Sequence, residues 1–336
     1  MQPVMKTRPQ QFVTSLVALM LLGLHAAGQS ASAATSTLPR VQNAKVTILS
    51  TMLADAGVGE WGFAALLEAD GHRVLIDTGA LPDTVLRNLQ ALRLDLASVE
   101  DVVLTHFHAD HTGGLLTLRR ELMKQNPRAL ARVHVARGVF WSRPGASGRE
   151  GNPMLGVKRE FEATGGQFIE HADWSELLPG VWLTGPVPRH TSEKNYGFHG
   201  DVGRVQSPAG LVEDNVPEDQ SVVVSTRDGL IVITGCGHAG IVNILDYTRG
   251  KLNHAPVYGV LGGLHLFEKP DEQIAWTADE MKKDGVRLFL GAHCTGIESV
   301  YQMRARMGLT RATAIVGAVG ASYVSGEGLH PGNIAR

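Results

Sequence analysis

The sequence is poor in cysteine, has no excess of positive charge and contains one long hydrophobic run only, near its start. Two cysteines among 336 residues are too few for a disulfide framework. The 31 basic residues are balanced by 33 acidic ones, and this net charge of −2 gives no sign of a nucleic-acid-binding surface. Apolar residues make up 43% of the chain, as in an ordinary globular protein with a sizeable core.

The hydrophobic run covers residues 12–28. Lys6 and Arg8 precede it and the small residues QSASAAT follow it, which is the order of a secretory signal peptide. The alternative is a single membrane anchor, but the run is short for a span. We therefore expect residues 1–34 to be a cleaved signal. Residues 35–336 would form a single exported domain, periplasmic or secreted, with no stable membrane anchor after cleavage.

Strand and helix patterns alternate along the remaining chain. Two hairpins are predicted with turns at Asp70-Gly71 and Asp228-Gly229, where apolar runs flank an Asp-Gly pair. Because both halves contain strands and helices, the pattern favours an α/β fold, a four-layer αβ/βα sandwich with mixed sheets, over two independent domains. Further strands are expected at 44–51, 99–106, 256–263 and 286–293, and helices at 82–92, 113–125 and 271–285.

The stretch 145–215 differs from the rest. It is rich in glycine, proline and polar residues, and its hydrophobic periodicity is weak. Long segments of this kind in a compact domain are usually functional or disordered. We interpret it as a loop-rich insert over the active site.

Four potential metal ligands lie within six residues in VVLTHFHADHTGG, residues 102–114. Residues two apart on an extended segment point the same way, so His106 and His108 can hold one ion. As the chain turns into the next helix, Asp110 and His111 are directed to a second position. Imidazole and carboxylate suit Zn²⁺ and other borderline divalent metals. The motif predicts one or two divalent ions, with Zn favoured and Mn or Fe as alternatives.

Three later strands also end near a histidine. Each has an aliphatic run, then glycine, then histidine, which places an imidazole at the edge of a sheet. These residues are His238, His265 and His293.

The His-x-His-x-Asp-His motif resembles that of the metallo-β-lactamase superfamily. The segments EWGFAALLE, VLIDTGA, LTGPVPRHT, GVLGGLHL and GAHCTG, and the longer one from 218 to 245, look like the branch that contains dihydropterin–ribofuranosylaminobenzene phosphate synthase and related metal-dependent hydrolases. The resemblance implies the sandwich fold and a metal site. It also implies that His238 matches the histidine of a Gly-His loop and His293 the last histidine ligand.

The chain departs from the superfamily at the bridging aspartate. LGGLHL holds His265 and no aspartate, so His265 is expected either as a ligand or as a group that hydrogen-bonds substrate. The resulting ligand sets are His106, His108 and His238 for one ion, and Asp110, His111 and His293 for the other, with His265 nearby.

Some residues are expected around these ligands. Asp77 ends a strand and is either a turn cap or a partner that orients a ligand histidine. His190, in a predicted rim loop, is a candidate substrate contact. Cys236 and Cys294 neighbour proposed ligands. We favour free thiols there; the alternatives are a thiolate ligand, at Cys236 before Cys294, or a single disulfide.

The site favours an exported metal-dependent hydrolase acting on a small molecule. A metal-bound hydroxide would attack an ester, phosphoester, lactone or amide bond, with Asp110 as the catalytic carboxylate that orients the nucleophile. The sequence has no Gly-x-Ser-x-Gly nucleophile motif. The alternatives are a carbon–nitrogen bond-forming enzyme like the synthase of the branch, or a non-catalytic metal-binding protein.

Overall fold

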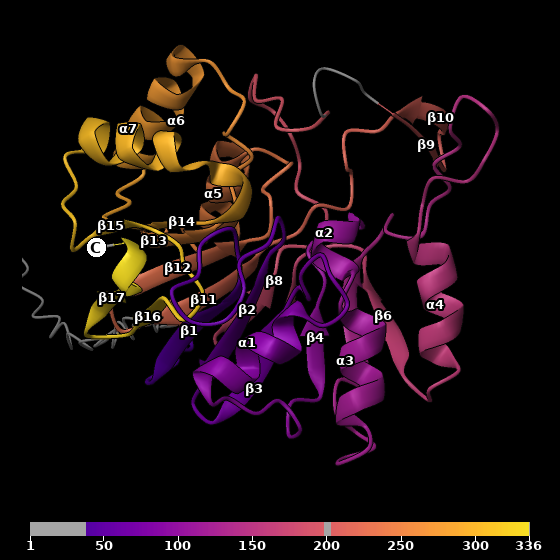
Figure 1. The fold of residues 1–336 in the computed structure, drawn as a ribbon. Helices are drawn as coiled ribbons and strands as arrows, with labels where there is room; N and C mark the ends of the chain where they lie inside the picture. Colours follow the sequence, from indigo (N-terminus) through magenta and orange to yellow (C-terminus); the bar gives the residue numbers. More distant parts are fainter. Residues whose placement is uncertain (1–37, 198–202, 336) are drawn as a thin grey trace, which may run out of the picture. The chain divides into compact units, whose positions relative to one another are not determined.

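Two β-sheets lie face to face between two layers of helices in the computed structural model, which describes residues 38–197 and 203–335 (Figure 1). The expected signal, residues 1–34, lies outside the described residues. No helix in the described part of the chain is long and apolar enough to cross a membrane.

The first sheet has eight strands in the order β17-β16-β1-β2-β3-β4-β5-β6. Strands β3 to β6 run parallel, and the rest pair antiparallel. The bounds are β1 Ala44–Ser50, β2 Ala64–Ala69, β3 His72–Ile76, β4 Asp101–Val103, β5 Arg132–Ala136, β6 Gln167–His171, β16 Ser322–Val324 and β17 Gly328–His330.

The second sheet has seven strands in the order β15-β14-β13-β12-β11-β8-β7, of which β12 to β15 run parallel. A separate pair, β9 and β10, forms a small two-stranded sheet. The bounds are β7 Ser175–Leu178, β8 Val181–Leu183, β9 Arg204–Ser207, β10 Gly210–Glu213, β11 Val222–Thr226, β12 Gly229–Thr234, β13 Val257–Gly262, β14 Leu288–Gly291 and β15 Ala314–Val316.

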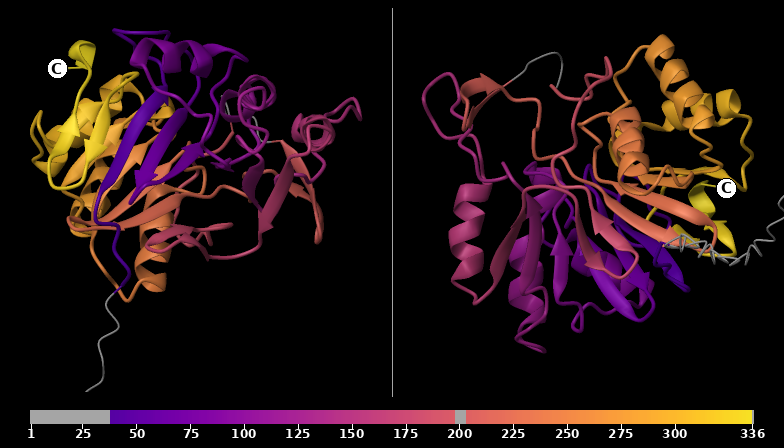
Figure 2. Two further views of the ribbon diagram at one scale, coloured as in Figure 1. Left: turned by 90° about the horizontal axis from the view of Figure 1, so that it is seen from below. Right: turned by 180° about the vertical axis from the view of Figure 1, so that it is seen from behind.

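The helices cover the two outer faces of the pair of sheets. Helices α1, α3 and α4 pack on the first sheet, and α5, α6 and α7 pack on the second, as the view from behind also shows (Figure 2). The bounds are α1 Thr84–Leu92, α2 Ala109–Thr112, α3 Leu115–Leu122, α4 Met154–Glu162, α5 Ile241–Lys251, α6 Asp271–Lys283 and α7 Ile297–Met307, with 3₁₀ turns at His293–Thr295 and Asn333–Ala335.

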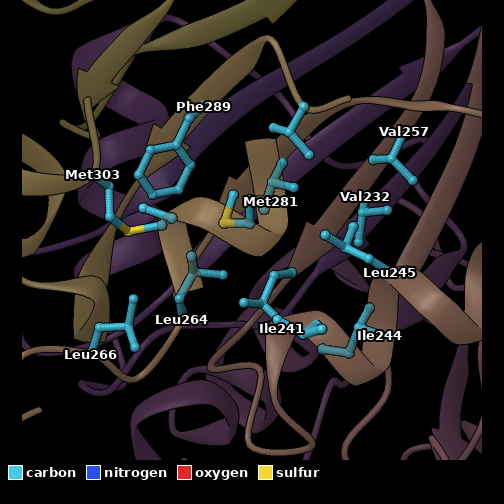
Figure 3. Close-up of a cluster of buried hydrophobic side chains, with 14 of the residues drawn as sticks. Val232, Ile241, Ile244, Leu245, Val257, Leu264, Leu266, Met281, Phe289 and Met303 are labelled. Carbon is cyan, nitrogen blue, oxygen red and sulfur yellow. The ribbon is translucent and has the colours of Figure 1, made fainter. Parts of the chain in front are cut away.

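The side chains of the central strands point alternately to the two faces of their sheet, which explains why each sheet packs against another sheet on one face and against helices on the other. In β12, Ile231 and Ile233 face the core between the sheets, whereas Leu230 and Val232 face α5 and its neighbours. Successive side chains of a strand point to opposite faces, so an unbroken apolar run buries both faces of its sheet. Figure 3 shows the outer cluster, with side chains of α5 packed close to Val232. The predicted four-layer sandwich with mixed sheets is confirmed.

The segment 145–215, expected as a loop-rich insert, contains regular secondary structure in its middle. Met154–Glu162 is a helix, and Gln167–His171 and Val181–Leu183 are strands of the two sheets. Strand β6 is an edge strand with no fully buried residue, so it carries no strong apolar alternation in the sequence. The flanking parts, around residues 143–151 and 203–216, do line the cavity described below.

Candidate metal centre

The carboxyl ends of several parallel strands meet at one edge of the sandwich, the usual place for a site in α/β folds. Each strand supplies a potential ligand or its support a few residues after it ends. These are Asp77 after β3, His106 after β4, Cys236 and His238 after β12, His265 after β13, and His293 after β14.

His106, His108 and His238 form the first group, with ligand atoms within 4.8 Å of one another. His106 Nε2 and His108 Nδ1 lie 3.0 Å apart. His238 Nδ1 donates to the carbonyl oxygen of Asn195 at 2.6 Å. This bond leaves Nε2 of His238 as the lone-pair nitrogen, and in the described part of the chain that buried atom has no hydrogen-bond partner.

Asp110, His111 and His293 form the second group, again within 4.8 Å. Nε2 of His293 lies 3.2 Å from Oδ2 of Asp110, and Nε2 of His111 lies 3.8 Å from the same oxygen. The structure thus brings together both ligand sets that the sequence analysis predicts. Their donor types and spacing fit one or two divalent ions.

Asp77 is fully buried and supports both groups. Its Oδ2 accepts from Nδ1 of His111 at 2.7 Å and from the Thr105 hydroxyl at 2.8 Å. Because that hydroxyl donates its hydrogen to Asp77, its oxygen accepts a hydrogen bond from Nδ1 of His106 at 3.0 Å. Asp77 therefore fixes the tautomers of one histidine in each group. Gly235 makes room for this network, since a Cβ there would lie 2.1 Å from the Thr105 hydroxyl.

Two of the histidines at the site have a left-handed backbone conformation. His265 and His293 have φ of 49° and 47°, values that non-glycine residues rarely adopt. The ring of His265 lies 4.6 Å from that of His238, and its ligand atom groups with Cys236 and Cys294. His265 is therefore at the site, beside the sulfur atoms. Strained backbone of this kind is concentrated at functional sites.

Burial and charge keep the first group neutral. Burial, together with the neighbouring histidines, lowers the pKa of His106 and His238 well below the ordinary range, and burial lowers that of His108 to about 3. Neutral imidazoles are the form that binds metals.

The second group lies in a negative field. Burial alone would raise the pKa of Asp110, but His111 and His293 outweigh it and hold the carboxylate ionised. Burial alone would lower the pKa of His111, but Asp110 and Asp77 raise it to about 9. The field at this position therefore favours a cation.

His190 does not reach the site, which corrects the expectation of a substrate contact. Its Nε2 pairs with Asp246 at 3.0 Å, about half of its side chain is exposed, and it lines a different pocket. Its backbone nitrogen is tied to the side chain of Asn243 in α5, which directs this loop away from the ligands.

A cavity of about 410 Å³ opens onto both groups. Its walls include residues that sequence reasoning missed: Trp61, Phe107, Arg143 and Arg204. The Arg143 guanidinium lies 3.6 Å from the centre of the Phe107 ring and pairs with Asp214 and Glu218, each at 2.7 Å. Of these four residues, only Phe107 could have been predicted from the sequence, because it lies inside the histidine motif.

Comparisons with known proteins indicate one superfamily. The chain is 29% identical over 269 residues, 77% of its length and 90% of the relative's, to 7,8-dihydropterin-6-methyl-4-(β-D-ribofuranosyl)-aminobenzene-5'-phosphate synthase of Methanocaldococcus jannaschii. It is similar to the crystal structure of Tm1679, a metal-dependent hydrolase of the β-lactamase superfamily, with 26% identity, a TM-score of 0.64, and coverage of 83% of this chain and 98% of that one.

A more distant structure shares the fold alone. The metallo-β-lactamase fold protein YhfI from Bacillus subtilis matches with a TM-score of 0.52 at 10% identity, over 84% of this chain and all of that one. The family model of the metallo-β-lactamase superfamily matches residues 62–252, more than half of the sequence. With the strand-end histidines and the sandwich around them, this match shows that the chain belongs to the metallo-β-lactamase superfamily.

Proposed function

We propose that this protein is an exported metal-dependent hydrolase that acts on an ester, phosphoester, lactone or amide bond of a small molecule. The observation that carries the proposal is the pair of buried donor groups beneath one open cavity. The export part rests on the order of basic, apolar and small residues in 1–34.

The residues of the chain divide the work. A divalent ion bound by these groups would lower the pKa of water from 15.7 to roughly 7 and polarise a substrate oxygen. His106, His108 and His238 offer neutral lone pairs, and Asp77 holds the rings in place. Asp110 is ionised and partly exposed, so its carboxylate can orient a water molecule by accepting a hydrogen bond from it.

A carbon–nitrogen bond-forming reaction is the second candidate, because the Methanocaldococcus relative is a synthase. The proposed export weighs against it, because a biosynthetic step is expected inside the cell. A purely metal-binding role fits poorly with a cavity that opens onto the donors and contains Asp110.

Removal of metal is expected to abolish hydrolysis. The purified mature protein should contain one or two equivalents of Zn, Mn or Fe by plasma mass spectrometry. It should cleave at least one member of a panel of phosphate mono- and diesters, lactones, β-lactams and simple esters. Chelation should stop turnover and metal addition should restore it. Bound metal with no turnover on the panel would argue for the synthase reaction, and a metal-free protein under metal-supplied conditions would refute the centre.

Trp61 is expected to contribute to substrate binding. Its ring lies 4.9 Å from that of His293 and 5.0 Å from that of Phe267, and 42% of the residue is exposed at the cavity. Aromatic contacts contribute about 0.5–1.5 kcal/mol beyond their area. With the substrate that the panel identifies, Trp61→Ala should raise KM roughly threefold to tenfold and change kcat less.

The control for this variant is His190→Ala, which should leave both constants unchanged, while Trp61→Phe should restore most of the binding. An unaltered KM in Trp61→Ala would show that the substrate does not contact this wall of the cavity.

A further inference from the structure

Two buried sulfur atoms lie next to each other at the site, and one of them contacts both donor groups. Cys236 and Cys294 are free thiols with about 2% or less of their surface exposed, and their Sγ atoms are 3.2 Å apart. Cys236 Sγ lies 3.1 Å from Nε2 of His111 and within 4.8 Å of a ring nitrogen of His106. His106 and His111 belong to different groups, so this sulfur stands beside both ion positions.

The charge of the site calls for an anion there. Two divalent ions would bring four positive charges into a buried space, and Asp110 is the one carboxylate in the donor groups formed by the described residues. Repulsion between cations that share a buried site is strong, because the surroundings screen it weakly. A thiolate beside both positions would offset this repulsion, and a metal ion deprotonates a thiol that it binds.

We propose that Cys236 is a thiolate ligand shared between the ion held by His106, His108 and His238 and the ion held by Asp110, His111 and His293. The inference rests on the metal centre of the proposed function. As the metal–sulfur bond forms, the Sγ–H bond breaks and its proton leaves to solvent through the cavity, which Cys236 lines. No oxidant or reductant takes part.

Cys294 supports this arrangement as a positioning residue. Its Sγ donates to Cys236 Sγ at 3.2 Å and accepts from the backbone N–H of His265 at 3.2 Å. A hydrogen bond from a neutral thiol stabilises the thiolate next to it and fixes its direction. The two cysteines therefore have different roles, although they touch each other.

Sulfur ligation also has a consequence for metal choice. Thiolates favour Zn and Fe, whereas carboxylates, carbonyls and water suit Mn and Mg. The protein should accordingly prefer Zn²⁺ to Mn²⁺, and this preference should depend on Cys236.

X-ray absorption at the zinc edge tests the assignment without reference to activity. The zinc-loaded full mature chain should show a sulfur scatterer at about 2.3 Å beside nitrogen scatterers at about 2.0–2.1 Å. Cys236→Ser should lose the sulfur scatterer and keep the nitrogen ones. The matched variant, Cys294→Ser, should keep the sulfur. In competition, Cys236→Ser should lose roughly tenfold or more of its preference for Zn²⁺ over Mn²⁺.

Several results would overturn the assignment. Zinc bound to the wild type through nitrogen and oxygen alone would refute it while leaving the hydrolase proposal standing. Sulfur that persists in Cys236→Ser and disappears in Cys294→Ser would move the ligand to the other cysteine. A wild type that binds Mn or Fe but no zinc would refute the assignment, and one that binds none of the three would refute the metal centre itself. If a variant fails to fold, the wild-type spectrum still decides whether a cysteine sulfur binds zinc.

Discussion

Replacing His238 with alanine is expected to remove the ion of the first group and to lower hydrolysis by about a thousandfold. Nε2 of His238 is a buried nitrogen that finds no hydrogen-bond partner in the described structure, so its only evident task is to bind a cation. Polarisation of substrate and water by a metal is worth several kcal/mol, and about 4 kcal/mol corresponds to roughly a thousandfold in rate.

Metal content and turnover should be measured together on this variant. The metal-to-protein ratio should fall in parallel with the rate, and in the presence of chelator the variant should melt below the wild type only by what the lost hydrogen bond to Asn195 and the vacated volume cost. His330→Ala is the control, since this histidine is about half exposed and pairs with Glu327 at the end of the first sheet. Full metal content in His238→Ala would contradict the first ligand set.

Asp77→Ala is expected to have the largest effect on stability. The carboxylate accepts three hydrogen bonds, from the backbone N–H and hydroxyl of Thr105 at 2.7 and 2.8 Å and from His111 at 2.7 Å. Removing it leaves these buried donors unpaired, which costs about 3–5 kcal/mol when a charged partner is involved. The loss of support for His106 and His111 should also weaken metal binding by about 10–100-fold.

Asp77→Asn separates the two effects. Its amide oxygen can still accept from the backbone N–H of Thr105, but its NH₂ group would face the Thr105 hydroxyl and Nδ1 of His111 and force the ring into the other tautomer. The proton would then sit on Nε2, the nitrogen directed at the metal. We expect denaturant unfolding to show a smaller loss of stability than in Asp77→Ala, with an equal or greater loss of metal affinity. If the asparagine variant binds metal like the wild type, Asp77 serves the fold alone.

The sequence predicts the sandwich and the ligand sets because both depend on short patterns. Aliphatic runs mark the buried strands, and a histidine after each run falls at the edge of a sheet whatever the loops do. Ile231 and Ile233 illustrate this, since their strand needs no further context to be recognised.

Other features depend on contacts that no local pattern records. Arg143 reaches the cavity because Asp214 and Glu218, over 70 residues away, bind its guanidinium. His190 is turned away from the cavity by Asn243, another distant residue. The helix Met154–Glu162 and the edge strand beside it are hidden in the sequence by the glycines and prolines around them. Long-range polar contacts and weakly buried edges are thus the parts that require the structure.

The two donor groups draw on strand ends in both sheets, from His106 after β4 to His293 after β14. A fragment of the chain that ends before β14 lacks His293 and cannot present the full set of ligands. Both sheets must therefore pack together before all the ligands can bind metal. The amount of bound metal should therefore report how much of the protein is completely folded. The metal–ligand bonds would also link strands that are far apart in the sequence. A substitution that loosens the packing between the sheets, however far from the cavity, would release metal before the strands themselves come apart.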